Sequence, residues 1–183
     1  MTRAGLSTER VVAAAAALAD EQGPAALSLA ALADRLGVRV PSLYKHVGGL
    51  PDLHRRLTLA GLRDLTAVLG EATVGRSRRD ALRACAAAWR AYARAHPGRY
   101  AAVQRSPGPD DDPELVAAAE RLTRLVLAVL RGYGLDEEAT VHATRAVRSA
   151  LHGFVSLEAA GGFGLPFAVD TSFDRLVDLL DAG

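Results

Sequence analysis

Five side chains that can donate hydrogen bonds fall within residues 39–46. Arg39 can read a guanine edge or hold a phosphate, while Ser42 and Tyr44 suit phosphate oxygens. Lys45 and His46 can add charge or hydrogen bonds at a nucleic-acid backbone. Two apolar neighbours can touch a thymine methyl group, and a serine precedes the helix before them. The candidate DNA-binding residues are therefore Ser28, Arg39, Val40, Pro41, Ser42, Tyr44, Lys45 and His46.

Two short helices joined by a tight turn are expected to position these side chains. Ser28 can cap a helix over residues 29–36, and Gly37 suits the left-handed conformation that often ends a helix. Pro41 is tolerated in a first helical turn, so the second helix is expected over residues 41–46. The apolar residues that would interlock the pair are Ala33, Leu36, Val38, Leu43 and Val47. This pattern is typical of a helix-turn-helix, whose second helix enters the major groove of DNA.

The rest of the chain also favours helices, because apolar residues recur at helical spacing between Gly and Pro breaks. Further helices are expected over residues 8–22, 51–69, 78–95, 100–105, 113–131 and 136–160, with a last one capped by Thr171 or Ser172. Asp112 and Asp136 are placed to begin the seventh and eighth helices. The sequence predicts an all-α fold of about nine helices. A helix-turn-helix domain would occupy residues 1–56, and a ligand-binding and dimerisation domain residues 57–183.

The charge balance gives little general attraction to DNA. The 183 residues carry 22 basic and 21 acidic side chains, for a net charge of +1. Residues 1–56 hold a small excess, with seven basic and five acidic side chains. One such module would bind DNA weakly, so the prediction requires a homodimer whose two recognition helices bind together.

Catalytic and metal-binding patterns are missing from the sequence. The five histidines are scattered, and no metalloprotease, nucleophile-elbow or phosphate-loop motif is present. The single cysteine, Cys85, excludes an intrachain disulfide. No apolar run is long enough to span a bilayer or placed as a signal peptide. We expect a cytoplasmic protein with no enzymatic activity, metal or cofactor, and no membrane association.

The N-terminal residues resemble the DNA-binding domain of the TetR family of bacterial transcriptional repressors. The resemblance covers residues 8–57 and rests on Leu27-Ser28, Ala33, Leu36-Gly37-Val38, Ser42-Leu43-Tyr44, His46-Val47 and Leu53. It implies that the third helix reads the operator. The chain departs from the family at Gly48-Gly49-Leu50, where members usually carry a phosphate-clamping lysine. Arg55, Arg56 or the backbone amides of residues 51–52 are the candidate substitutes.

The C-terminal half resembles the TetR subgroup with a Trp-x-x-x-His-Gly signature. His152 and Gly153 match it, while Arg148 stands where the tryptophan would be. The resemblance implies a small-molecule pocket among the fourth to eighth helices. The candidate ligand-binding residues are Trp89, Tyr92, Tyr100, Leu122, Arg148 and His152. The aromatic residues are equally explained as core, and Arg148 either faces solvent or meets an acid such as Glu158 or a ligand anion.

The resemblance also implies that the eighth and ninth helices pair two subunits. The candidate interface residues are Val147, Leu151, Phe154, Phe173, Leu176, Val177 and Leu180, although the same apolar stripe fits ordinary intrachain core. The resulting hypothesis is a homodimeric repressor released from a palindromic operator by a small apolar or amphipathic inducer. The alternatives are an activator with the same DNA-binding head and a helical protein-interaction module.

Overall fold

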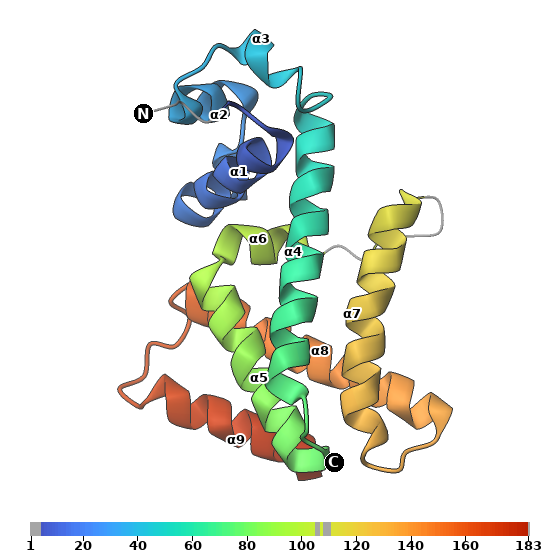
Figure 1. Ribbon diagram of the computed structural model, residues 1–183. Coiled ribbons are helices and arrows are strands. Elements are labelled where there is room, and N and C mark those ends of the chain that lie inside the picture. The colour runs from blue at the N-terminus through green and yellow to red at the C-terminus, as the bar shows by residue number, and fades with distance from the viewer. Residues whose placement is uncertain (1–4, 105–106, 108–110, 183) are drawn as a thin grey trace. The chain divides into compact units, whose positions relative to one another are not determined.

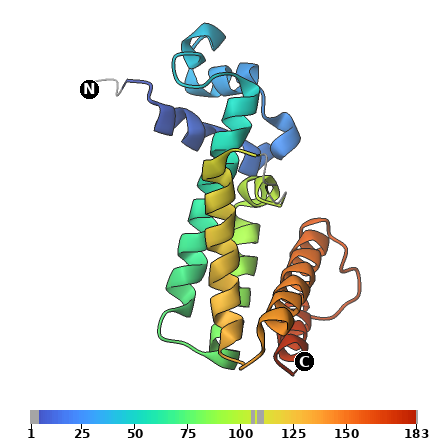
Figure 2. The same cartoon turned by 90° about the vertical axis from the view of Figure 1, so that its right-hand side faces the viewer.

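The computed structural model describes residues 5–104, 107 and 111–182. Those residues form nine α-helices and one 3-10 turn with no strand, which confirms the all-α prediction (Figures 1 and 2). None of these helices is long and apolar enough to cross a membrane. The chain divides into two compact units, of which the first contains Met1–Arg63 and Ala95–Ala119 and the second Asp64–Arg94 and Glu120–Gly183.

The first unit collects the N-terminal helices and one short helix from the middle of the chain. Its elements are α1 (Thr8–Gln22), the 3-10 turn η1 (Pro24–Ala26), α2 (Leu29–Leu36), α3 (Val40–Leu43), the start of α4 (Leu50–Thr73), α6 (Pro97–Ala102) and the start of α7 (Pro113–Arg131). Branched aliphatic side chains fill the space between them. The largest fully buried ones are Val11, Leu32, Leu43, Leu53 and Leu57. α1, α2, α3 and α4 therefore share one hydrophobic core.

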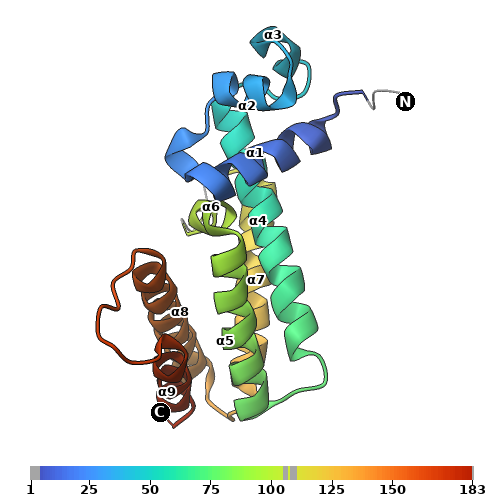
Figure 3. The ribbon, with the colours of Figure 1, turned by 90° about the vertical axis from the view of Figure 1, so that its left-hand side faces the viewer.

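The α6 helix packs directly against the backbone of α1 (Figure 3). A Cβ added to Gly98 would lie 2.2 Å from the carbonyl carbon and oxygen of Ala19, so only glycine permits this approach. Next to it, the Asp20 carboxylate accepts hydrogen bonds from the backbone N–H and the Nε of Arg99, both at 2.9 Å. The contact thus combines a steric requirement with a charge-assisted pair.

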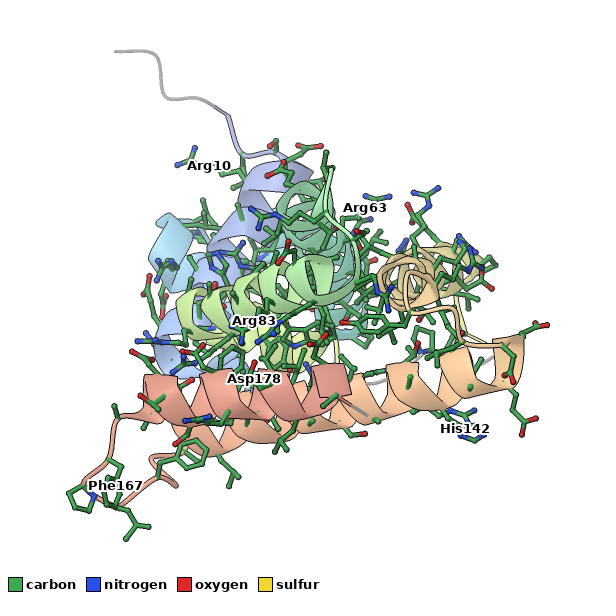
Figure 4. The ribbon with its side chains drawn as sticks, turned by 90° about the horizontal axis from the view of Figure 1, so that it is seen from below. Arg10, Arg63, Arg83, His142, Phe167 and Asp178 are labelled. Atoms are coloured by element: carbon green, nitrogen blue, oxygen red, sulfur yellow. The ribbon has the colours of Figure 1, made fainter. Side chains whose placement is uncertain are left out.

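The second unit contains the remaining helices. These are α5 (Arg78–Ala95), the end of α4, most of α7, α8 (Glu137–Ala159) and α9 (Val169–Ala182). α8 and α9 lie side by side (Figure 4). The buried side chains of this unit include Leu82, Cys85, Trp89, Val126, Leu130, Leu151 and Phe173.

Helix starts were predicted well where a Ser or Asp side chain caps them. Ser7 accepts a hydrogen bond from the N–H of Arg10 at 3.2 Å, and Ser28 accepts one from Ala31 at 3.1 Å. Asp112 and Asp136 cap α7 and α8 in the same way. A short polar side chain at the N-cap satisfies backbone donors that the helix itself cannot, and this signal is local in the sequence.

Two short helices differ from their predicted bounds. α3 ends at Leu43 and not at residue 46, because the His46 N–H bonds to the Leu43 carbonyl three residues back and tightens the turn. α6 begins at Pro97, where residues 100–105 were expected, because proline is favoured in a first helical turn. Part of the predicted range, Arg105, lies outside the described residues.

The expected cap of the last helix was wrong. α9 begins at Val169, and the Ser172 N–H already donates to the Ala168 carbonyl at 3.3 Å. Thr171 and Ser172 therefore lie inside its first turn. α4 is also longer than expected and runs through Gly70 to Thr73, since one glycine costs a helix only about 1 kcal/mol.

Gly98→Ala should destabilise the protein, because the new methyl group must displace the backbone of α1. We expect a loss of about 1–3 kcal/mol in unfolding free energy, the cost typical of overpacking. Chemical denaturation followed by circular dichroism measures it. Gly164→Ala is the control, because a Cβ there meets nothing within 4 Å. Equal stability of the two variants would contradict the close approach.

Candidate nucleic-acid interface

The turn between α2 and α3 has a defined backbone geometry. Gly37 adopts φ 66° and ψ 34°, the left-handed conformation that side chains disfavour. Its N–H donates to the Asp34 carbonyl at 3.1 Å, and the Val38 N–H donates to the Ala33 carbonyl at 3.0 Å. These two bonds form the Schellman motif and use carbonyls that the end of α2 leaves unpaired. The turn therefore fixes the direction in which the chain enters α3.

The segment of residues 39–47 around α3 has one buried side and one side that faces solvent. Leu43 and Val47 are almost completely buried against the core. Tyr44 is 58% exposed, and Arg39, Pro41 and Lys45 are also exposed. The half-buried members of the candidate set are Ser28, Val40, Ser42 and His46. The structure brings seven of the eight candidate DNA-binding residues together on α3 and its two ends.

Ser28 differs from the other seven because its hydroxyl oxygen caps α2. A capping oxygen accepts one bond from the backbone, which leaves the hydroxyl proton and one remaining lone pair for another partner. His46 is placed by its own backbone, since its carbonyl accepts a hydrogen bond from Thr8 Oγ1 at 3.3 Å. A hydrogen bond thus joins the start of α1 to the end of residues 39–46, which we call the recognition segment.

Two of the expected substitutes for the family's phosphate clamp, Arg55 and Arg56, are already paired. Asp52 Oδ2 accepts hydrogen bonds from the Gly48 N–H and from Arg56 Nε, both at 2.9 Å. Both donors hold the pKa of Asp52 below its usual range, so the carboxylate is ionised at neutral pH. Arg55 lies 3.5 Å from Asp112 and 3.4 Å from Glu114. A carboxylate therefore occupies the start of α4, where a phosphate would gain from the helix dipole.

The candidate ligand-binding residues fall in both units. Trp89 and Tyr92 are buried in the second unit, where Leu122, Arg148 and His152 are half-buried. Tyr100 is buried in the first unit. The carboxylate of Glu158, an expected partner for Arg148, instead accepts two hydrogen bonds from Arg90, at 2.9 and 2.5 Å. No sequence pattern indicated this pair, because the two residues are 68 positions apart.

The candidate dimer residues are mostly internal to one chain. Val147, Leu151, Phe173 and Val177 are buried, while Phe154, Leu176 and Leu180 are half-buried. Sequence reasoning missed the exposed apolar side chains of this region. Leu157 on α8 is 52% exposed and Leu179 on α9 is 72% exposed, while Leu165 is 78% exposed on the loop between these helices. Phe167, also 78% exposed, lies on the same loop (Figure 4). Helical spacing identifies an apolar residue but not which neighbour covers it.

Groups suited to metal or covalent chemistry do not assemble in the described residues. No cluster of three or more His, Cys, Asp or Glu side chains there is placed to hold a metal ion. Burial raises the pKa of the Cys85 thiol to about 12, so it carries no thiolate at neutral pH. The geometry concentrates hydrogen-bond donors on α3 and at its two ends, and this is chemistry for contacting a nucleic acid.

A helix-turn-helix with an exposed second helix, on an otherwise all-helical chain, defines a DNA-binding transcriptional regulator. The comparison with protein families agrees. Residues 11–48 match the family described as "Bacterial regulatory proteins, tetR family", and residues 82–180 match "Tetracyclin repressor-like, C-terminal domain". The chain belongs to the TetR family of transcriptional regulators, a class without enzymatic activity.

Relatives and solved structures are similar along almost the whole chain. The HTH-type transcriptional regulator Rv0681 of Mycobacterium tuberculosis is 44% identical over 180 residues, covering 98% of this chain and 82% of that protein. A structure of a Rhodococcus sp. RHA1 protein has a TM-score of 0.83 at 24% identity, covering 100% and 98% of the two chains. A variant of TetR from Acinetobacter baumannii AYE, in complex with minocycline, has a TM-score of 0.68 at 24% identity, covering 98% and 96%.

Asp52→Asn should raise the affinity for DNA. The variant keeps a hydrogen-bond acceptor for the Gly48 N–H but removes the negative charge that neutralises Arg56 and repels phosphate. We expect tighter binding by a few-fold at low salt, with a logarithmic salt dependence steeper by about one unit per head. Fluorescence anisotropy of a labelled duplex at several salt concentrations measures both quantities. Asp34→Asn, an exposed acid on α2, is the charge-matched control, and equal effects of the two substitutions would contradict a local role for Asp52.

Proposed function

We propose that this chain is a homodimeric repressor that binds a palindromic operator and releases it when a small molecule binds the regulatory helices. The observation that carries the proposal is the set of exposed donors Arg39, Tyr44 and Lys45 at the two ends of α3, beside the buried Leu43 and Val47. The Arg39 guanidinium has the fork geometry to read guanine, and Tyr44 and Lys45 suit the adjacent phosphates. The proposed domains are residues 1–56 for DNA binding and residues 57–183 for regulation.

Dimerisation follows from the small charge of the head. Two heads must bind half-sites about 34–36 Å apart to reach useful affinity. The exposed Leu157 and Leu179 support an interface on α8 and α9, because large apolar side chains at this exposure gain from being covered. The half-buried Phe154, Leu176 and Leu180 can contribute apolar edges to the same interface.

The proposal of ligand binding rests on the aromatic and polar side chains of the second unit and on one solved structure of a similar protein. The Acinetobacter baumannii structure holds minocycline. The buried Trp89 and Tyr92, with Leu122, Arg148 and His152, are the residues proposed to meet the inducer. Their apolar and aromatic character favours a largely apolar or amphipathic molecule. For Tyr100, which belongs to the first unit, a role in ligand binding stays a prediction.

Release would require a mechanical link between the two units, and two chain segments that run through both are the candidates for it. α4 is one continuous helix from Leu50 to Thr73 and carries residues of both units. α5 ends at Ala95, two residues before α6, which packs on α1 through Gly98 and the Asp20–Arg99 pair. A ligand shifts the operator equilibrium only by its preference for the released arrangement. We propose that it acts on the spacing of the two heads in the cytoplasm.

The double substitution Arg39→Ala with Tyr44→Ala should abolish specific DNA binding. Both side chains are exposed and leave the core untouched, so fold and oligomeric state should persist. We expect affinity for the promoter DNA upstream of its own gene to fall more than about 100-fold, since each half-site loses two contacts. Gel-shift titration measures it, with Arg76→Ala, an exposed arginine outside the head, as control. Unchanged binding by the double variant would show that these two side chains do not contact the operator, and no specific binding by the unsubstituted protein would favour a protein-interaction module.

Leu157→Glu with Leu179→Glu should convert the dimer into monomers. The buried charges would repel across the symmetric interface, and DNA affinity should fall with the loss of avidity. Light scattering after size exclusion measures the mass, with Val74→Glu, an exposed apolar residue between α4 and α5, as the matched control. A dimer that survives both substitutions would place the interface elsewhere.

A further inference from the structure

α5 and α9 are joined by ion pairs near the C-terminus of α9. Arg79 lies 3.0 Å from Asp178 and 3.6 Å from Asp181, and Arg83 also pairs with Asp178. Figure 4 shows Arg83 and Asp178 facing one another. Tyr133 donates a hydrogen bond to Asp181 at 2.5 Å. This end of the helix pair is closed by its own charges.

Near the start of α9, the closing residue is Arg90 on α5. It is only 9% exposed, and its guanidinium makes two hydrogen bonds with Glu158 and lies 2.7 Å from Asp170. Its central carbon is 5.5 Å from the centre of the Phe154 ring and 4.7 Å from that of Phe173. Glu158 alone suffices to balance the Arg90 charge, so Asp170, whose side chain is 80% exposed, is a second and replaceable anion.

An open groove of about 400 Å³ separates the two closed ends. It exists because Ala87 and Ala91 stand on α5 where larger side chains would fill the space. The lining residues are Arg83, Ala87, Arg90, Ala91 and Arg94 of α5 and Asp170, Phe173, Asp174 and Val177 of α9. All belong to the second unit, and none is among the six ligand-binding residues expected from the sequence.

The charges of the groove are incompletely matched. Arg94 lies one helical turn beyond Arg90 and contributes a favourable charge to Glu158, whose pKa is lowered chiefly by its hydrogen bonds with Arg90. Among the described residues, the Arg94 side chain has no direct ion pair or hydrogen bond. At this end of the groove, the guanidinium groups of Arg90 and Arg94 face the half-buried Glu158 carboxylate and the exposed Asp170 carboxylate. An external anion can therefore take the place of the Asp170 carboxylate.

We propose that this groove binds a small amphipathic organic carboxylate. Its head group would lie between Arg94 and Arg90 in place of the Asp170 carboxylate, and its apolar body would rest on Phe173, Val177 and the two alanines. Guanidinium forks match the planar geometry of a carboxylate. Asp174 at the groove wall disfavours a second negative charge, which selects a monoanion. The volume lies at the lower end of the range for small-molecule sites. The proposal does not depend on operator binding or release.

The probe for this site is naphthalene-2-carboxylate, compared with the isosteric neutral naphthalene-2-carboxamide. Both are titrated into the full-length ¹⁵N-labelled protein, and dissociation constants are taken from amide chemical-shift changes. We expect the carboxylate to bind at least fivefold more tightly than the amide, because only the anion gains charge-assisted hydrogen bonds. Equal affinity, or no binding of the carboxylate at millimolar concentration, overturns the proposal.

Three variants test the named groups. Arg94→Gln should weaken carboxylate binding at least fivefold, while Arg131→Gln, an exposed arginine outside the groove, should leave it unchanged. Asp170→Asn should tighten binding at least twofold, because it removes the competing anion. Ala87→Leu should abolish binding by filling the groove, and Ala87 is exposed enough to accept the larger side chain.

Two outcomes for these variants would contradict the proposed binding site. Equal weakening by Arg94→Gln and Arg131→Gln would show that only general charge matters. Weaker binding in Asp170→Asn would show that Asp170 does not compete with the ligand. Every substituted side chain lies at the protein surface, so each variant is expected to fold. Circular dichroism spectra check this for each variant.

Discussion

A side chain at residue 98 would collide with the backbone of α1, and much of the first unit depends on that space staying empty. With glycine there, α6 approaches α1 closely enough for Asp20 to accept two hydrogen bonds from Arg99. α1 in turn is tied to the recognition segment by the bond from Thr8 to the carbonyl of His46. In the proposed mechanism, a displacement of α6 would therefore reach the proposed DNA-binding residues 39–46 through α1, without a long side-chain network between them.

The recognition segment could be predicted from the sequence because its determinants are local. Ser28, Gly37 and Pro41 each specify a backbone conformation within a few residues, and Leu43 and Val47 identify the buried face. The same reasoning found the caps at Asp112 and Asp136. It failed at α6 and α9, where the competing start signals are short and tertiary packing decides between them.

The ion pairs between distant residues could not be predicted from the sequence, for a different reason. Arg90 and Glu158 are 68 residues apart, and Arg83 and Asp178 are 95 apart, so no periodicity connects them. With 22 basic and 21 acidic side chains in the chain, composition allows a very large number of pairings. The same limit applies to Asp52. Its position at the start of α4 was visible, but its hydrogen bond to the Gly48 N–H depends on the loop geometry.

The single tryptophan has a practical consequence. Trp89 is buried in the second unit, and the chain contains no other indole. Intrinsic fluorescence excited at the red edge of the absorption band therefore arises from that unit alone, and the first unit contributes no fluorescence under this excitation. Unfolding of the second unit can be followed by fluorescence in the unmodified chain. Comparison with far-ultraviolet circular dichroism, which senses every helix, separates the stability of one unit from that of the other.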